Sequence, residues 1–272
     1  MWDSKSSRGL NSCSKVVILA GGFGTRLSEE TYLRPKPMVE IGPQPILWHI
    51  MKIYSHYGFK NFIICLGYKG YMIKEYFSNY FLHRSDLTID LKSHKIKYHR
   101  NTCEPWTVTL VDTGLDTLTG GRIKLIRDFV ENQTFMLTYG DGVANIDIRK
   151  LGKFHEASGK YATVAAVKPP SKFGSLDLQG SGQIVRRFSE KLETGNAWIN
   201  GGFFVLEPEI FDYVKRIETS WERESLEKLA KDKQLVAYKH HGFWRCMDTL
   251  RDKEELIAAW NSGEAPWKVW KD

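Results

Sequence analysis

A glycine-rich turn directly follows an apolar run near the start of the chain, and a basic side chain comes soon after it. Residues 16–19 (VVIL) are apolar and mostly β-branched, which predicts a short buried strand, and the turn carries Gly21, Gly22 and Gly24. Glycines let backbone N–H groups approach a phosphate closely, because no side chain holds the anion away. Arg26 adds a planar set of donors that suits phosphate oxygens. The segment therefore predicts a site for a phosphorylated ligand.

A lysine on a restrained backbone strengthens this interpretation. Lys36 stands between Pro35 and Pro37, so its ammonium group can be held in one direction. The turn is not a Walker A loop, since no Gly-Lys-Ser/Thr sequence follows its glycines. It also matches a dinucleotide-binding fingerprint poorly, because Leu27 occupies the place of the third glycine. A plain structural turn is the alternative for the glycines alone, and the added Arg26 and Lys36 favour phosphate binding.

Two aspartates follow apolar runs that are typical of strands. Asp141 lies next to Gly140 after residues 135–138, and Asp248 follows residues 242–247 (GFWRCM). Carboxylates at the carboxyl ends of strands reach the ligand crevice of an α/β sheet, and such oxygens hold magnesium beside nucleotide phosphates. An Asp-Gly turn and a helix cap are the structural alternatives, and only the fold can bring the two residues together.

A polar group late in the chain could bind a second substrate. Glu190 and Lys191 end a short predicted strand, and Asn200 with Gly201 lies close behind. Lysine can hold a phosphate as a point charge, while carboxylate and amide groups hydrogen-bond sugar hydroxyls. A surface ion pair is the alternative for Glu190 and Lys191.

A further glycine-bearing segment precedes a predicted helix. Gly114 and Thr119 lie in it, and backbone groups there could approach a nucleobase or ribose. Capping of the helix by the Thr119 hydroxyl is the alternative.

The order of predicted elements indicates an α/β fold. Strands and helices alternate, which favours a parallel sheet with right-handed crossovers. The helices are expected over residues 45–57, 70–80, 121–130, 147–157 and 250–260. The strands are expected over 16–19, 61–66, 107–111, 135–138, 162–167 and from 235 onward, with further β-structure in 86–113 and 172–206. Thr249 is expected to cap the last helix. We expect a polar, disordered tail over 1–14 and one domain over 15–272, with a nucleotide-binding part to about 168 and a sugar-binding and C-terminal part after it.

Composition narrows the class of partner. The chain has 272 residues, with 39 basic and 32 acidic side chains and a formal charge of +7, which suits anionic ligands. The basic residues are dispersed, which disfavours a nucleic-acid groove, the competing interpretation. The four cysteines are scattered and fit a reducing, cytoplasmic environment, and no apolar run predicts a membrane span.

The strings GGFGTRL and RPKPM closely resemble the signature of the sugar-1-phosphate nucleotidyltransferases. Longer strings, among them PILWHIMKIY, EPWTVTLVDTG, YGDGV and MDTLRD, resemble its glucose-1-phosphate cytidylyltransferase branch. The resemblance implies a Rossmann-like nucleotidyltransferase fold, with a mixed, mostly parallel sheet flanked by helices and a β-rich sugar-binding lobe. It also implies Mg²⁺, a homo-oligomer (a hexamer), and conversion of CTP and α-D-glucose 1-phosphate to CDP-glucose and pyrophosphate. Donor use of UTP or dTTP, and a homologue that binds nucleotide without turnover, are the alternatives.

The resemblance also implies roles for single residues. Arg26, Lys36 and Lys191 would act in catalysis, and Asp141 with Asp248 would hold magnesium. The nucleotide would be bound by Gly21, Gly22, Gly24, Thr25, Arg26, Lys36, Gly114, Thr119 and Gly140, and the sugar phosphate by Glu190, Lys191, Asn200 and Gly201. Two departures from the family pattern stand near these residues: Leu192 follows the Glu-Lys pair in place of proline, and Arg245-Cys246 precede Met247 in place of Gln-Pro.

Overall fold

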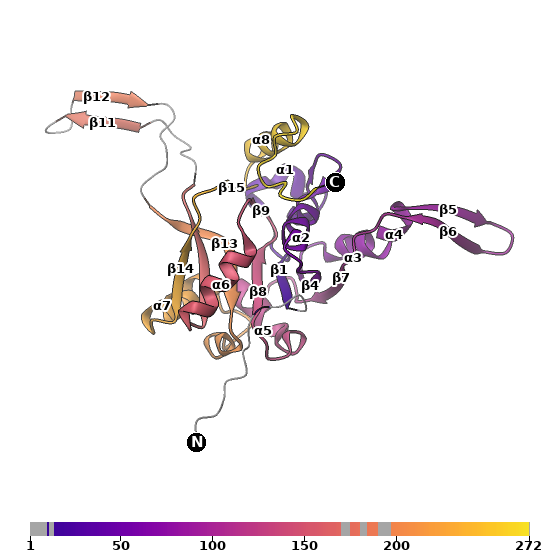
Figure 1. Ribbon diagram of the computed structural model, residues 1–272, viewed down its shortest axis with the longest axis horizontal. Coiled ribbons are helices and arrows are strands. Elements are labelled where there is room, and N and C mark those ends of the chain that lie inside the picture. Colours follow the sequence, from indigo (N-terminus) through magenta and orange to yellow (C-terminus); the bar gives the residue numbers. More distant parts are fainter. Residues whose placement is uncertain (1–9, 11–13, 170–174, 180–183, 190–196, 272) are drawn as a thin grey trace, which may run out of the picture.

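A seven-stranded sheet forms the centre of the molecule (Figure 1). The structure is a computed structural model that describes residues 10, 14–169, 175–179, 184–189 and 197–271. The strand order is β14-β10-β13-β8-β1-β4-β7, and every neighbouring pair is parallel except the two pairs that β13 makes with β10 and β8. The strands are β1 (Lys15–Leu19), β4 (Asn61–Leu66), β7 (Thr107–Asp112), β8 (Phe135–Tyr139), β10 (Ala162–Val167), β13 (Ile199–Leu206) and β14 (Leu235–Lys239). The predicted α/β class, with a mixed and mostly parallel sheet, is confirmed.

Both faces of the sheet are buried, which is why its central strand is continuously apolar. Alternate residues of β1 point to opposite faces: Val16 and Ile18 pack in one hydrophobic cluster, and Val17 and Leu19 pack in the other. The first cluster includes helix α2 (Ile46–His56) and the C-terminal tryptophans, and the second includes residues of α5 (Thr119–Leu125). The sheet therefore forms the middle layer of three.

The remaining helices agree with the sequence pattern in place but differ at some ends. They are α1 (Ser28–Thr31), α3 (Gly70–Ser78), α4 (Tyr80–His83), α6 (Ile148–Ser158), α7 (Glu227–Lys231) and α8 (Leu250–Asn261). The helix expected over 70–80 ends at Ser78, and the one expected over 121–130 divides into α5 and a 3₁₀ turn at Arg127–Val130. The predicted cap of α8 is confirmed, because the Thr249 hydroxyl accepts from the backbone N–H of Asp252 in a reciprocal capping box.

Four two-stranded ribbons complete the described structure. They are β2 (Glu40–Ile41) with β3 (Gln44–Pro45), β5 (Ser85–Asp90) with β6 (Lys95–Asn101), β9 (Gly142–Ala144) with β15 (Trp244–Cys246), and β11 (Ser175–Gln179) with β12 (Ile184–Ser189), all antiparallel. The β5–β6 ribbon extends as an arm away from the body (Figure 1). The strands β11, β12 and β13 agree with the β-structure expected late in the chain.

Two residues of the expected tail have defined contacts. The backbone N–H of Leu10 donates to Glu156 Oε1 at 2.9 Å, and Ser14, just before β1, is buried. Among the described residues, no helix is both long enough and apolar enough to cross a membrane.

A buried histidine joins helix α2 to the C-terminal segment. His49 is 0% exposed; Trp267 Nε1 donates to its Nδ1 at 3.3 Å, and its Nε2 lies 2.9 Å from the Ile41 carbonyl oxygen. The ring can satisfy both contacts only as the neutral tautomer that carries its proton on Nε2. Burial lowers the pKa of His49 to about 4, although its backbone hydrogen bonds act to raise that pKa.

We expect this histidine to make stability depend on pH. The unfolded chain takes up its proton near pH 6.5, whereas the folded protein resists protonation until about pH 4. The contribution of His49 is therefore complete above pH 6.5 and decreases as the pH falls toward 4, by about 3 kcal/mol in total. Chemical unfolding of wild type and His49→Gln at several pH values measures it. The variant, although less stable at pH 7.5, should lose less stability on acidification; equal losses would contradict the prediction.

Candidate active site

A pocket of about 530 Å³ opens at the carboxyl ends of the central parallel strands. Its walls come from residues 19–26 after β1, 115–119 after β7 and 139–141 after β8. This is the edge at which open α/β sheets bind ligands. The expected nucleotide and metal residues that line the pocket are Gly21, Gly22, Gly24, Thr25, Arg26, Lys36, Thr119, Gly140 and Asp141.

Local backbone geometry explains two of the glycines. Gly24 has φ of +65°, and a Cβ there would lie 2.7 Å from Thr31 Cγ2, so a side chain would meet both strain and a clash. A Cβ on Gly22 would meet no atom within 4 Å, so this glycine borders open space. The loop therefore keeps a narrow turn at Gly24 and exposes its backbone at Gly22.

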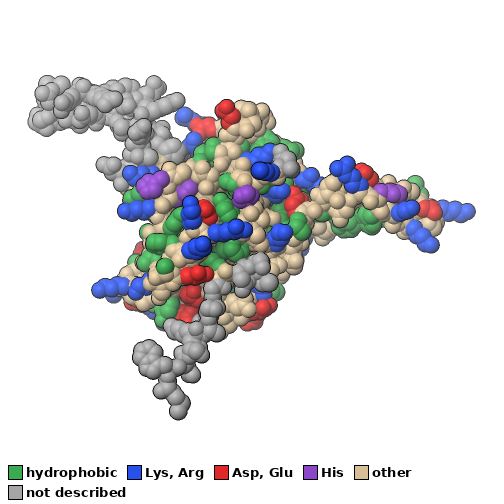
Figure 2. Space-filling model, in the orientation of Figure 1, with side chains coloured by type: hydrophobic (Ala, Val, Ile, Leu, Met, Phe, Trp, Pro, Cys, Tyr) green, Lys and Arg blue, Asp and Glu red, His purple; other side chains and the backbone are tan. Residues whose placement is uncertain are grey.

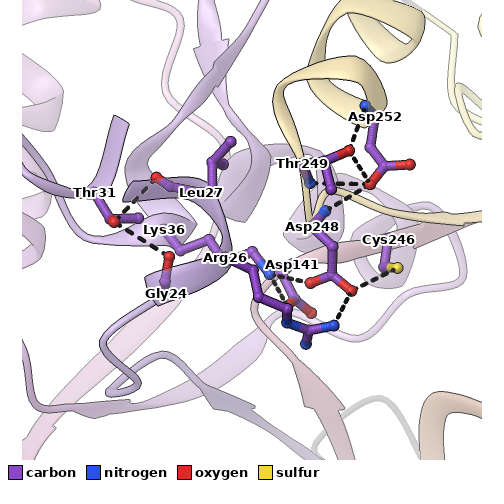
Figure 3. A network of polar contacts seen from close by, with 10 residues as sticks. All are labelled: Gly24, Arg26, Leu27, Thr31, Lys36, Asp141, Cys246, Asp248, Thr249 and Asp252. Atoms are coloured by element: carbon purple, nitrogen blue, oxygen red, sulfur yellow. Dashed lines mark hydrogen bonds and ion pairs between the residues drawn. The ribbon is translucent and has the colours of Figure 1, made fainter. Parts of the chain in front are cut away.

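The Lys36 ammonium group lies between the two predicted metal ligands (Figure 3). Its Nζ is 2.7 Å from Asp141 Oδ2 and 2.6 Å from Asp248 Oδ1. The guanidinium of Arg26 contacts the other oxygen of Asp248 at 2.8 Å. The two aspartates meet because β9, directly after Asp141, pairs with β15, which ends just before Asp248.

Lys36 and Asp248 hold each other in their ionised forms. Burial acts to lower the pKa of Lys36, but attraction to Asp141 and Asp248 outweighs it, and the pKa is raised. Burial acts to raise the pKa of Asp248, but Lys36 and then Arg26 outweigh it, and that pKa is lowered. The pair is therefore an ammonium and a carboxylate at neutral pH.

The geometry of the two carboxylates fits a divalent cation. One oxygen of each carboxylate already lies 2.6–2.7 Å from the same positive charge. The two oxygens would need to move only slightly closer together to bind a smaller and more highly charged ion. Magnesium commonly takes one or two protein carboxylates and completes its shell with water and substrate phosphates. In the described part of the chain no group of three or more His, Cys, Asp or Glu side chains gathers as a metal site. Asp141 and Asp248 thus suit a cation whose remaining ligands come from substrate and solvent.

A polar network in the pocket joins the predicted residue Thr119 to Tyr139 and Glu222, which were not predicted as site residues. Tyr139 OH donates to Glu222 Oε1 at 2.7 Å, and Thr119 Oγ1 donates to Glu222 Oε2 at 2.6 Å. The Thr119 hydroxyl therefore does not cap α5, whose N-cap is Leu118 without a side-chain bond. Glu222 lies far from Tyr139 in sequence, and nothing in the sequence around Glu222 indicates a pocket residue.

The expected sugar-side residues are only partly placed. Asn200 Nδ2 donates to Tyr139 OH at 3.1 Å, and the Gly201 carbonyl accepts from Trp244 Nε1 at 2.7 Å. Both thus border the Tyr139 side of the pocket without lining it. Glu190 and Lys191 lie outside the described residues, and their roles stay predictions.

Gly114 lies beside the pocket, whereas the nearby Arg122 lines it. Gly114 does not line it; its φ is +85° and its carbonyl accepts from Arg122 Nη1 at 2.8 Å. Arg122 is almost fully buried and was not predicted as a functional residue. The adjacent glycines, Gly120 and Gly121, were the one sequence signal that pointed to its neighbourhood.

The departures Arg245 and Cys246 leave the carboxylates intact. Arg245 Nη2 pairs with Glu255 Oε2 at 2.7 Å, so its charge has a partner other than Asp248. The Cys246 thiol donates to Asp248 Oδ2 at 3.5 Å, and burial together with the nearby carboxylates raises its pKa to about 12. The thiol is therefore neutral and adds a hydrogen bond to the proposed metal ligand.

Comparisons with known proteins show which proteins this chain resembles. The family model described as nucleotidyl transferase matches residues 15–259. The glucose-1-phosphate cytidylyltransferase of Salmonella typhi is 56% identical over 258 residues, which are 94% of this chain and 100% of that protein. The probable glucose-1-phosphate cytidylyltransferase of Bacillus subtilis is 47% identical over 94% of this chain and 100% of its own length. A UDP-glucose pyrophosphorylase solved with UDP-glucose has a TM-score of 0.67 at 19% identity, covering 92% of this chain and 99% of that one, which shows the shared fold.

Proposed function

The chain belongs to the nucleotidyl transferase family, and from this premise we propose that it transfers a cytidylyl group from CTP to α-D-glucose 1-phosphate. The products are CDP-glucose and pyrophosphate. The observation that supports the proposal best is the meeting of Asp141, Asp248 and two cations at the mouth of a glycine-lined pocket. The names of the similar proteins in Salmonella typhi and Bacillus subtilis support the choice of both substrates.

The reaction needs charge neutralisation more than proton transfer. A sugar phosphate is mostly dianionic at neutral pH, since its second pKa is about 6, so it can attack the α-phosphorus of CTP without a general base. The obstacle is the approach of two polyanions and the charge of the transition state. Mg²⁺, held by Asp141 and Asp248, would neutralise phosphate charge when bound.

The chain's own groups bind and orient the substrates. Backbone N–H groups at Gly21, Gly22 and Gly24 would hold the phosphates with Arg26. The oxygens of Asp141 and Asp248 that contact Lys36 cannot bind a divalent cation and the ammonium at the same time. We therefore infer that Lys36 contacts the phosphates when the enzyme holds metal and substrate. Asn200 would hold the sugar.

A matrix of nucleotides and sugar phosphates tests the proposal. Purified protein is assayed for pyrophosphate release with CTP, UTP, dTTP or GTP against glucose 1-phosphate and its epimers, with and without Mg²⁺. CTP with glucose 1-phosphate should give the highest kcat/KM, and chelation should abolish turnover. A higher kcat/KM with UTP or dTTP would replace the nucleotide in the assignment. Binding without any pyrophosphate release would identify a non-catalytic homologue.

A lysine variant tests the sugar-phosphate side. Lys191→Ala should raise the KM for glucose 1-phosphate by about tenfold to a hundredfold, on the scale of a charged hydrogen bond, and leave the KM for CTP nearly unchanged. The measurement is steady-state kinetics with each substrate varied at a saturating level of the other, and Lys168→Ala is a matched control. An increase confined to the KM for CTP would show that Lys191 does not hold the sugar phosphate.

The assembly and location of the enzyme are further parts of the proposal. We propose a homo-oligomer, because the β5–β6 arm carries exposed Ile89, Leu91, Ile96 and Tyr98, and we propose a hexamer from the resemblance to the family. Figure 2 shows hydrophobic and basic side chains together on this arm. Light scattering measures the mass, and Leu91→Glu should weaken assembly.

We assign the enzyme to the cytoplasm, since all three described cysteines are free.

A further inference from the structure

Arg122 extends from helix α5 to the pocket, which it lines, and it is only 4% exposed. Its guanidinium contacts oxygen atoms of three separate segments of the chain. Nη1 lies 3.0 Å from the Leu66 carbonyl, 2.6 Å from Thr113 Oγ1 and 2.8 Å from the Gly114 carbonyl, while Nη2 lies 3.0 Å from the Gly21 carbonyl and 3.2 Å from the Leu115 carbonyl. These oxygens belong to the last residue of β4 and to the loops after β1 and β7, so one side chain ties together the carboxyl ends of three adjacent strands.

Two glycines show that the loops are built around this guanidinium. A Cβ on Gly21 would lie 2.2 Å from Arg122 Nη1, and a Cβ on Gly67 would lie 2.5 Å from the Gly21 carbonyl oxygen and 2.7 Å from Arg122 Nη1. Both positions have ordinary backbone angles, because neither is among the glycines with positive φ. The need for glycine at Gly21 therefore arises from the space that Arg122 occupies, and the need at Gly67 arises from Arg122 together with the Gly21 carbonyl that Arg122 contacts.

The partners of this arginine are unusual for a buried charge. Buried guanidinium groups generally pair with carboxylates. Within the described residues, every hydrogen bond of the Arg122 guanidinium goes to an uncharged oxygen, and four of its five acceptors are backbone carbonyls. The donors of this side chain therefore hold the loops in place. Because Gly21 belongs to the loop expected to hold the phosphates, its position matters for the nucleotide.

We propose that Arg122 is a positioning residue that fixes the nucleotide loops after β1, β4 and β7. The N–H groups around Gly21 then already point to the place of the triphosphate before CTP binds. The inference rests on the proposed function and deepens it. The planar fork is essential in this role, because only a guanidinium can reach the loops on both sides at once. Its loss should weaken use of the nucleotide and spare the sugar phosphate.

Kinetics of three variants test the role. Arg122→Gln should raise the KM for CTP by about tenfold or more and change the KM for glucose 1-phosphate by less than about threefold. Arg122→Lys should show a similar loss, since an ammonium keeps the charge but not the fork. Arg127→Gln is the matched control, because it removes an exposed arginine on the adjacent turn, away from the pocket.

Other results would overturn the proposal. Full activity in Arg122→Lys would assign the effect to charge alone, and equal increases of both KM values that follow the loss in Tm would assign a merely structural role. If Arg122→Gln does not fold, Thr113→Val removes one acceptor of the same guanidinium and should raise the KM for CTP by about threefold, with no change as the contradicting result. If wild type releases no pyrophosphate from CTP, the proposed function fails. Calorimetric titration of wild type and Arg122→Lys with nucleotide then still tests the positioning role.

Discussion

Asp141→Asn and Asp248→Asn should each lower kcat by at least about a hundredfold, the scale expected when a main electrostatic contribution to the transition state is lost. Each change removes one negative charge from a pair of carboxylates that already share a single cation at 2.6–2.7 Å. An amide oxygen binds magnesium more weakly than a carboxylate does, so the concentration of Mg²⁺ needed for half-maximal rate should also rise. Steady-state rates over a range of Mg²⁺ concentrations measure both effects.

The fold should survive these substitutions. Lys36 keeps one carboxylate partner in either variant, and the Asn side chain can still accept a hydrogen bond from it. Asp128→Asn is a matched control, because Asp128 is exposed and outside the pocket. Circular dichroism should show an unchanged spectrum for all three. Near-normal turnover of either pocket variant in saturating Mg²⁺ would remove that residue from the proposed metal site.

The sheet could be predicted because its central strands are buried on both faces. Residues 16–19, 61–66 and 135–138 are short apolar runs bounded by turn residues, and all three lie in the parallel part of the sheet. The arrangement of the carboxylates could not be predicted from such runs. It depends on the pairing of β9 with β15, two three-residue strands with little pattern of their own.

Residues whose importance depends on distant partners were missed for the same reason. Arg122 lies in a sequence typical of a helix start, and only the fold shows that its guanidinium meets loops after β1, β4 and β7. Lys36 was expected to contact phosphate, which stays a prediction, and only the fold shows that its ammonium lies between two carboxylates. The sequence indicates which side chains can bind charge, but their partners follow from long-range packing.

Lys36→Met should lower kcat by about a thousandfold and weaken the use of CTP, which is the second large effect that we expect. Lys36 is 8% exposed, and its ammonium is held by two aspartates. Methionine would fill the same space without the charge. If the lysine contacts the phosphates in the loaded enzyme, its loss removes stabilisation in the transition state.

The same substitution should have an opposite effect on the metal. Without the ammonium, Asp141 and Asp248 face each other with no cation between them, and their repulsion should favour a divalent ion. Calorimetric titration of the nucleotide-free protein should therefore show Mg²⁺ or Mn²⁺ binding at least as tightly as in wild type, although turnover is nearly lost. Lys36→Arg restores the charge but not the compact shape, so it should not rescue kcat. Weaker metal binding together with the lost turnover would mean that Lys36 helps to build the carboxylate site, and its proposed contact with the phosphates would lose its support.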